Sequence, residues 1–131
     1  MPTIDGIHHL AITVSDADRS AEFYGRLLGL EEVFEIDDDT VRARVFGGDG
    51  FLFGVRHYKG YDKDRFSEFR TGMDHFAFGV PCREDLAGFE DRLRELGATF
   101  TPTCDTPLGP VLVFRDPDGI QGEFFLAAGA G

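Results

Sequence analysis

The sequence predicts an α+β protein made of two successive modules with the same order, strand–helix–strand–strand–strand. The first observation is a repeat: segments 7–14 and 73–80 each follow a glycine and carry histidine, alanine and valine at matching positions. The second is its spacing, because the two histidines lie 66 positions apart in a chain of 131 residues. A repeat of half the chain length indicates two similar structural units. The predicted boundaries are about 5–58 for module 1, 59–71 for a linker and 72–128 for module 2.

The first half gives one helix signal among several strand signals. Residues 7–14 alternate between apolar and other residues, which is typical of a strand. A helix is expected after Ser15 or Asp16, either of which suits an N-cap, and Gly29 is placed to end it. Three further strands are predicted at 31–36, 41–46 and 51–57, separated by acidic and glycine-rich turns.

The second half repeats this order. A strand at 73–80 precedes a helix that begins after Cys82 and ends at Gly97, with apolar residues at helical spacing. Turns are expected at 105–109 and 116–119. The remaining strands are predicted at 98–101, 111–114 and 120–127, followed by a frayed tail at 128–131. Between the modules, residues 58–71 mix charged and aromatic residues without a period, which indicates a linker or arm.

Composition limits the classes of partner. The net charge of −11 opposes binding to phosphate backbones, so no nucleic-acid partner is expected. No apolar run approaches the roughly 20 residues of a membrane span, and the N-terminal stretch lacks a secretion signal. Cys82 and Cys104 form no disulfide framework and are interpreted as reduced thiols. These features predict a cytoplasmic protein without a membrane partner.

Two histidines at the same place in two related modules suggest a metal site. If the modules face each other across a pseudo-twofold axis, His9 and His75 converge, and imidazole is a common metal ligand. Glu123 interrupts an otherwise apolar strand, where coordination to a cation would compensate a buried carboxylate. Its counterpart in module 1 is Gly54, so coordination positions would remain open, as in catalytic sites. The alternative is that each histidine is an ordinary strand residue with a satisfied hydrogen bond.

Four residues are candidates to line a substrate pocket. Arg56 shares strand parity with Gly54 and could hold an anionic substrate, or be a surface charge at a strand end. Thr13, Gln121 and Phe125 share parity with the candidate ligands and are equally candidates for substrate contact or ordinary lining. His8 is placed on the opposite face from His9 by alternation and is interpreted as structural. No residue stands out as a general base.

Five stretches of the sequence carry a family signal: HLAITVSD (9–16), AEFYGRLLGL (21–30), HFAFGV (75–80), FRDPDG (114–119) and Glu123. Together they resemble the vicinal oxygen chelate superfamily, which includes glyoxalases, extradiol dioxygenases, fosfomycin-resistance thiol transferases and bleomycin-resistance proteins. The resemblance implies paired βαβββ modules that form a curved, cup-shaped mixed sheet around one divalent metal ion. The family's metal ligands fall on His9, His75 and Glu123.

The resemblance also implies partners and a reaction class. It predicts a homodimer, with sites that could be shared between chains, and a metal-dependent enzyme that chelates two neighbouring oxygens of a small molecule. Dioxygenase and glyoxalase-like lyase or isomerase reactions both remain open, although Gly54 cannot supply the fourth ligand of a true glyoxalase. Two imidazoles and one carboxylate accept Fe, Mn, Zn, Ni or Co without selecting one. The alternative function is a metal-free antibiotic-binding or metabolite-binding resistance protein.

Six phenylalanines are candidates for an aromatic lining of the cup: Phe51, Phe53, Phe76, Phe78, Phe124 and Phe125.

Overall fold

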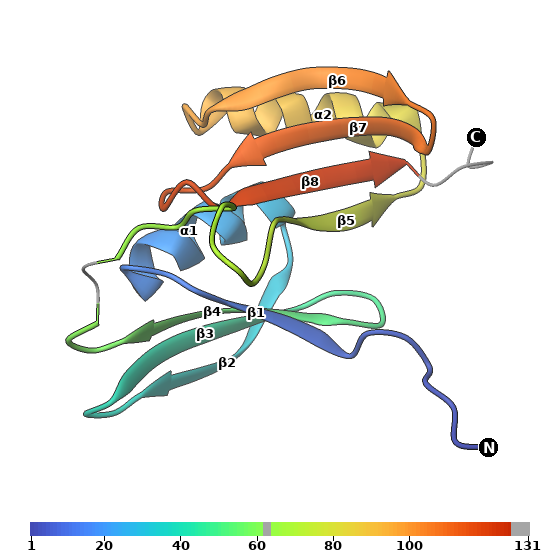
Figure 1. The fold of residues 1–131 in the computed structure, drawn as a ribbon. Helices are drawn as coiled ribbons and strands as arrows, with labels where there is room; N and C mark the ends of the chain where they lie inside the picture. The colour runs from blue at the N-terminus through green and yellow to red at the C-terminus, as the bar shows by residue number, and fades with distance from the viewer. Residues whose placement is uncertain (62–63, 127–131) are drawn as a thin grey trace. The chain divides into compact units, whose positions relative to one another are not determined.

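The computed structural model describes residues 1–61 and 64–126 and divides into two compact units, Met1–Asp64 and Arg65–Gly131. Each unit contains one helix and one four-stranded mixed sheet, and Figure 1 labels these elements. The first unit consists of β1 (His9–Thr13), α1 (Ala17–Leu28), β2 (Glu31–Asp37), β3 (Val41–Gly47) and β4 (Leu52–Tyr58). The second consists of β5 (Phe76–Val80), α2 (Arg83–Glu95), β6 (Phe100–Thr106), β7 (Gly109–Arg115) and β8 (Gln121–Leu126).

The two sheets have the same topology. Their strand orders are β1-β4-β3-β2 and β5-β8-β7-β6. The pairs β1–β4 and β5–β8 are parallel, and all other neighbouring pairs are antiparallel. The predicted α+β fold of two βαβββ modules is therefore confirmed. Within the predicted linker, residues 59–61 and 64–71 form turns and bends without helix or strand. Residues 62–63 and 127–131, which include the predicted tail, lie outside the described part of the chain.

The core of the first unit lies between α1 and the sheet. The helix begins where the Asp16 carboxylate accepts the Arg19 amide at 3.1 Å, and it ends at Gly29, which adopts a left-handed φ of 65°. Tyr24 is fully buried, and its ring lies 4.7 Å from that of Phe53 on β4. Both helix ends therefore follow from the capping residues seen in the sequence.

The core of the second unit is aromatic. Phe89 of α2 stacks on Phe124 of β8 with ring centroids 3.9 Å apart and planes inclined by 6°. Phe114 of β7 lies 5.4 Å from Phe124 on the same side. Gly122 also faces this layer, and a Cβ atom placed there would overlap the Phe114 ring. The core thus occupies the helix-covered face of the sheet, and the opposite face is left for other side chains.

Strand alternation places Glu123 on that opposite face. Glu123 pairs with Ala77 of β5 and with Val113 of β7, whereas the neighbouring Phe124 points into the core. A tight turn at 116–119 precedes the strand and fixes its start. The Asp116 carboxylate, on a residue only 6% exposed, accepts the Asp118 amide at 2.8 Å and the Ile120 amide at 2.9 Å.

Several predicted strand boundaries differ from the structure by one to five residues, most at β5 and β6. β5 begins at Phe76, three residues after the predicted start, because its ladder with β8 begins at the Phe76–Gly122 pair. The strand predicted at 98–101 corresponds to β6, which begins at Phe100 and continues to Thr106. The turn predicted at 105–109 is therefore narrowed to residues 107–108. A bulge between Thr101 and Cys104 accommodates Pro102, which lacks an amide hydrogen, on this edge strand.

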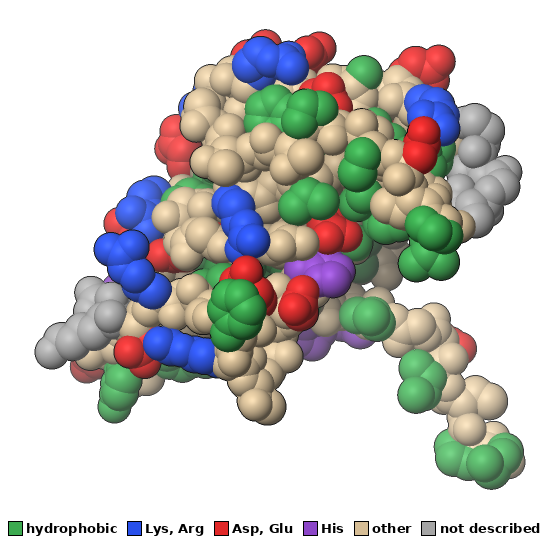
Figure 2. Space-filling model, turned by 45° about the horizontal axis from the view of Figure 1, so that its top comes forward, with side chains coloured by type: hydrophobic (Ala, Val, Ile, Leu, Met, Phe, Trp, Pro, Cys, Tyr) green, Lys and Arg blue, Asp and Glu red, His purple; other side chains and the backbone are tan. Residues whose placement is uncertain are grey.

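Acidic and basic side chains are interspersed on the visible surface (Figure 2). In the first unit, Arg42 contacts Asp18 at 3.0 Å and Glu35 at 2.7 Å, so charges of α1 and the sheet compensate each other locally. The N-terminal segment leaves Ile4 and Ile7 largely exposed. Among the described helices, neither is long and apolar enough to cross a membrane.

Candidate functional site: a histidine–glutamate pair and an apolar hollow

The second unit brings two of the three predicted ligands together. His75 lies just before β5 rather than within it, and its Nε2 atom is 3.6 Å from Oε2 of Glu123. Ala77 of β5 pairs in register with Glu123, so the strand neighbour of the carboxylate carries only a methyl group. Glu123 is only 8% exposed, whereas the His75 side chain is 42% exposed. A nearly buried carboxylate therefore faces an accessible imidazole.

Neighbouring polar groups restrain both side chains. Gln121, two residues before Glu123 on the same strand face, donates from Nε2 to Oε2 of Glu123 at 2.9 Å. Asp74 contacts the other ring nitrogen of His75, with Oδ1 and Nδ1 2.7 Å apart. The predicted pocket residue Gln121 is thus engaged with the candidate ligand, which is a contact that strand parity alone did not reveal.

The donor set fits a divalent metal. Two donors that share one metal at bond lengths of about 2.0–2.2 Å lie about 3 Å apart, so the observed 3.6 Å separation needs to close by roughly half an ångström. Imidazole nitrogen and carboxylate oxygen suit Fe, Mn, Zn, Ni and Co. The third predicted ligand, His9, belongs to the first unit. Among residues 1–61 and 64–126, no group of three or more His, Cys, Asp or Glu side chains is gathered to hold a metal. The complete triad therefore stays a prediction.

The first unit presents His9 in a hollow on the open face of its sheet. The hollow has a volume of about 310 Å³ and is lined by His8, His9, Leu10, Ala11, Val33, Phe34, Val45, Leu52, Gly54 and Arg56. His8 was expected on the opposite face but lines the same hollow, and its Nδ1 atom lies 2.9 Å from Nδ1 of His9. The reason is that β1 begins only at His9, so strand alternation does not govern the residue before it.

An irregularity in β2 supplies two apolar walls of this hollow. The register between β2 and β3 shifts between Glu32 and Phe34, so Val33 is an extra residue on that edge. As a result, consecutive side chains, Val33 and Phe34, both reach the hollow although each is about half exposed. Regular alternation would have placed only one of them there.

Gly54 explains why this hollow contains no carboxylate counterpart of Glu123. It pairs with Ala11 and Val45 on the open face. A Cβ atom at Gly54 would lie 3.4 Å from Val45 and 3.9 Å from Ala11, which are ordinary van der Waals distances. A Cβ atom would therefore fit at this position, and its absence follows from the glycine in the sequence.

Arg56 is the cationic residue at this hollow. It pairs in register with Thr13, so the two predicted substrate contacts are neighbours on the open face. Its guanidinium carbon lies 5.6 Å from the Tyr58 ring centroid, and its Nε atom donates to the Tyr58 hydroxyl at 3.2 Å. This aromatic contact directs the cation along the strand, while the side chain continues to line the hollow.

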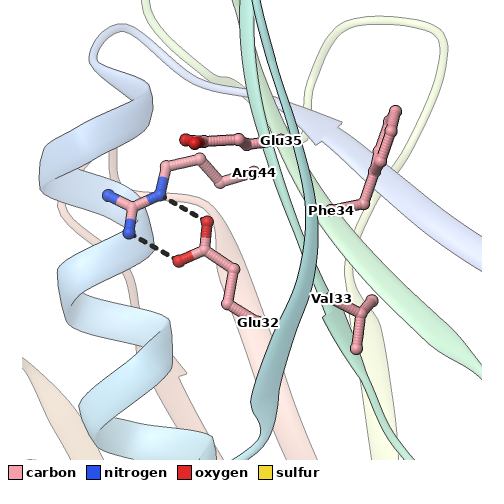
Figure 3. Close-up of a pocket in the computed structure, with 5 residues that line it drawn as sticks. All are labelled: Glu32, Val33, Phe34, Glu35 and Arg44. Atoms are coloured by element: carbon pink, nitrogen blue, oxygen red, sulfur yellow. Dashed lines mark hydrogen bonds and ion pairs between the residues drawn. The ribbon is translucent and has the colours of Figure 1, made fainter.

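A second hollow of about 540 Å³ lies along β2 and is lined by Glu32, Val33, Phe34, Glu35 and Arg44. Figure 3 shows Glu32 and Arg44 paired on the side facing α1, with Val33 and Phe34 projecting from the opposite side. Arg44 donates to both Glu32 oxygens, at 2.9 and 2.6 Å. This pairing lowers the pKa of Glu32 and raises that of Arg44. Arg42 compensates Glu35 at 2.7 Å, so each charged side chain of this hollow already has a partner in the protein.

The predicted aromatic lining is largely wrong. Phe53, Phe76 and Phe124 are buried on the helix-covered faces, and Phe78 packs against two of them. Phe125 is half-buried on the same face as Glu123, in register with Gly79, as its parity predicted. Parity identifies which residues share a face, but not which face the helix covers.

Comparison with known proteins places the chain in a family. Residues 6–124 match the description of the glyoxalase/bleomycin resistance protein/dioxygenase superfamily. The chain belongs to this superfamily. The resemblance noted from the sequence motifs is thereby confirmed.

Individual relatives carry different activities in their names. The chain is 29% identical over 119 residues to metallothiol transferase FosB of Shouchella clausii, covering 88% of this chain and 76% of that protein. It is 25% identical to the putative ring-cleaving dioxygenase MhqA of Bacillus subtilis, of which it covers 38%. A solved glyoxylase/bleomycin resistance protein/dioxygenase domain from Frankia sp. EAN1pec matches with a TM-score of 0.90 and 36% identity, over 95% of this chain and 99% of that one.

Proposed function

We propose that this protein is a divalent-metal-dependent enzyme that acts on a small molecule through two neighbouring substrate oxygens. The proposed ligands are His9, His75 and Glu123. The observation that carries the proposal is the facing pair in the second unit, where an imidazole nitrogen lies 3.6 Å from a nearly buried carboxylate oxygen. A carboxylate in this setting is costly unless a cation or hydrogen bonds compensate it, and Gln121 supplies only one hydrogen bond to Oε2.

The proposed chemistry divides between the metal and the protein. When bound, the metal ion supplies Lewis-acid stabilisation of negative charge on substrate oxygens. Arg56 would attract an anionic part of the substrate, and the apolar walls of the first hollow would exclude water around it. Thr13 and Phe125 are proposed as lining. The family description and the dioxygenase relative support a dioxygenase or a glyoxalase-like lyase or isomerase reaction. The relative named metallothiol transferase adds thiol transfer to the reactions found among similar proteins.

The second candidate is a metal-free protein that binds an antibiotic or metabolite. The family includes bleomycin resistance proteins, and the hollow around His9 and Arg56 has the volume and apolar walls of a small-ligand site without requiring a metal. The net charge of −11 would favour a cationic ligand.

We also propose that the protein is a cytoplasmic homodimer, with sites that could be shared between chains. Size-exclusion chromatography with light scattering would measure the mass of the assembly.

Metal content measured by plasma mass spectrometry separates the two candidates. Protein purified without chelator or affinity metal is compared with His75→Ala and with a control, His57→Ala, which removes an imidazole outside the proposed triad. The enzyme proposal expects close to one equivalent of a divalent transition metal in the wild type and the control, and its loss in His75→Ala. No metal in any of the three proteins, with no thermal shift on adding Mn(II), Fe(II), Co(II), Ni(II) or Zn(II), would refute it and leave the binding protein.

A further inference from the structure

Each candidate ligand histidine is contacted at Nδ1 by the residue directly before it in the chain. In the second unit, Asp74 Oδ1 lies 2.7 Å from Nδ1 of His75. In the first unit, His8 Nδ1 lies 2.9 Å from Nδ1 of His9. The two contacts occupy equivalent positions of the repeat, although the residues that make them differ in chemistry. This recurrence indicates a shared role rather than two unrelated surface contacts.

We infer that His8 and Asp74 are positioning residues, each accepting the Nδ1 proton of the following histidine and leaving its Nε2 atom to coordinate a metal. The inference rests on the proposed function. A carboxylate oxygen can only accept, so the Asp74 contact fixes His75 with its proton on Nδ1. Which nitrogen of an imidazole binds a metal is set by the hydrogen bond that the other nitrogen makes.

The remaining geometry agrees with this assignment in the second unit. With Nδ1 of His75 held by Asp74, the nitrogen that faces Glu123 is Nε2, at 3.6 Å from Oε2. Gln121 restrains that same carboxylate. Asp74 thus holds the imidazole at its far nitrogen, while Gln121 holds the carboxylate at the same Oε2 atom that faces the imidazole. Both donor groups are restrained facing each other before any ion binds.

In the first unit, the assignment requires a specific arrangement of two neutral imidazoles. His9 must carry its proton on Nδ1 and donate it to Nδ1 of His8, which in turn carries its own proton on Nε2. The rings are nearly perpendicular, with planes at 87° and centroids 5.1 Å apart, so the contact is edge-on and compatible with a hydrogen bond in the plane of one ring.

The test reads the proton positions directly. Long-range ¹H–¹⁵N NMR spectra at about pH 8 distinguish imidazoles protonated on Nδ1 from those protonated on Nε2, and the chain contains only four histidines to assign. We expect both His9 and His75 in the Nδ1-protonated form. Asp74→Ala should change the pattern of His75 and leave His9 unchanged, and His8→Ala should do the reverse. Wild-type spectra with either ligand histidine protonated on Nε2 would overturn the inference.

Metal affinity provides the second readout, by calorimetric titration with Co(II). Asp74→Ala is expected to weaken binding about 10–100-fold, the usual effect of removing a group that holds a ligand histidine. The matched control is Asp91→Ala, because Asp91 is similarly exposed, at 72% against 68% for Asp74, and contacts Arg94 away from the pair. It should change the affinity less than about 3-fold. Equal affinities for Asp74→Ala and the wild type would refute the role of Asp74. A wild type that binds no metal, with Nδ1-protonated histidines, would refute the proposed function instead.

Discussion

Replacing Phe124 by alanine tests the assignment of the two faces of β8. Phe124 is 1% exposed, stacks on Phe89 at 3.9 Å and lies 5.4 Å from Phe114. A buried phenylalanine removes about 150–250 Å² from water, which at about 25 cal/mol/Å² corresponds to about 4–6 kcal/mol. Alanine retains a small part of this, so we expect Phe124→Ala to lower the free energy of unfolding by about 3–5 kcal/mol.

The matched control is the next residue, Phe125. It has the same side chain on the same strand but is half-buried on the open face, so Phe125→Ala should cost about 1–2 kcal/mol. Urea unfolding followed by far-UV circular dichroism measures both, since the chain contains no tryptophan. Equal losses, or a larger loss for Phe125→Ala, would show that the face assignment is wrong. Glu123 would then lie on the core side, and the proposed site would fail with it.

Two further predictions concern a glycine and a carboxylate. Gly122→Ala should lower the free energy of unfolding by about 1–3 kcal/mol, because the new Cβ overlaps the Phe114 ring. Gly79→Ala, whose Cβ would meet nothing within 4 Å, should change it by less than about 0.5 kcal/mol, and similar urea curves for both would contradict this packing. Two backbone amides lower the pKa of Asp38, so its contribution to stability is present above the unfolded value of about 3.9 and is lost as the pH falls through the lower folded pKa. The stability difference between wild type and Asp38→Ala should accordingly shrink between about pH 6 and about pH 3, and a difference that does not change would contradict it.

Local signals in the sequence were sufficient for most of the fold. The candidate N-caps Ser15 and Asp16, of which Asp16 is the cap in the structure, and Gly29 predicted the ends of α1, because capping is decided by residues close together in the chain. The 66-residue repeat predicted the second unit from the first. The β6 region failed, because Pro102 argues against a strand unless the strand is known to lie at a sheet edge with a bulge.

For the candidate site, the sequence pointed to the residues that come together in the second unit but not to the contacts that support them. Duplication of the histidine and the isolated Glu123 were visible in the sequence, and the structure brings His75 and Glu123 together. The contacts of His8 and Asp74 were not, since alternation assigns consecutive residues to opposite faces and both precede the start of a strand. Val33 and Phe34 were missed for a related reason, because a bulge interrupts the alternation.

The turn at 116–119 has a consequence beyond joining two strands. Two amides donate to the buried Asp116 carboxylate, and the Asp116 amide itself donates to the Ile120 carbonyl at 3.0 Å. These bonds fix the register of β8, and therefore which of its side chains face each side of the sheet. A slip of one residue would exchange the two faces, burying the Glu123 carboxylate among phenylalanines and exposing Phe124. The turn thus determines that Glu123, and not Phe124, lies on the open face of the sheet, although the turn itself is not part of the proposed site. Insertions or deletions between Asp116 and Glu123 should be far more damaging than substitutions there.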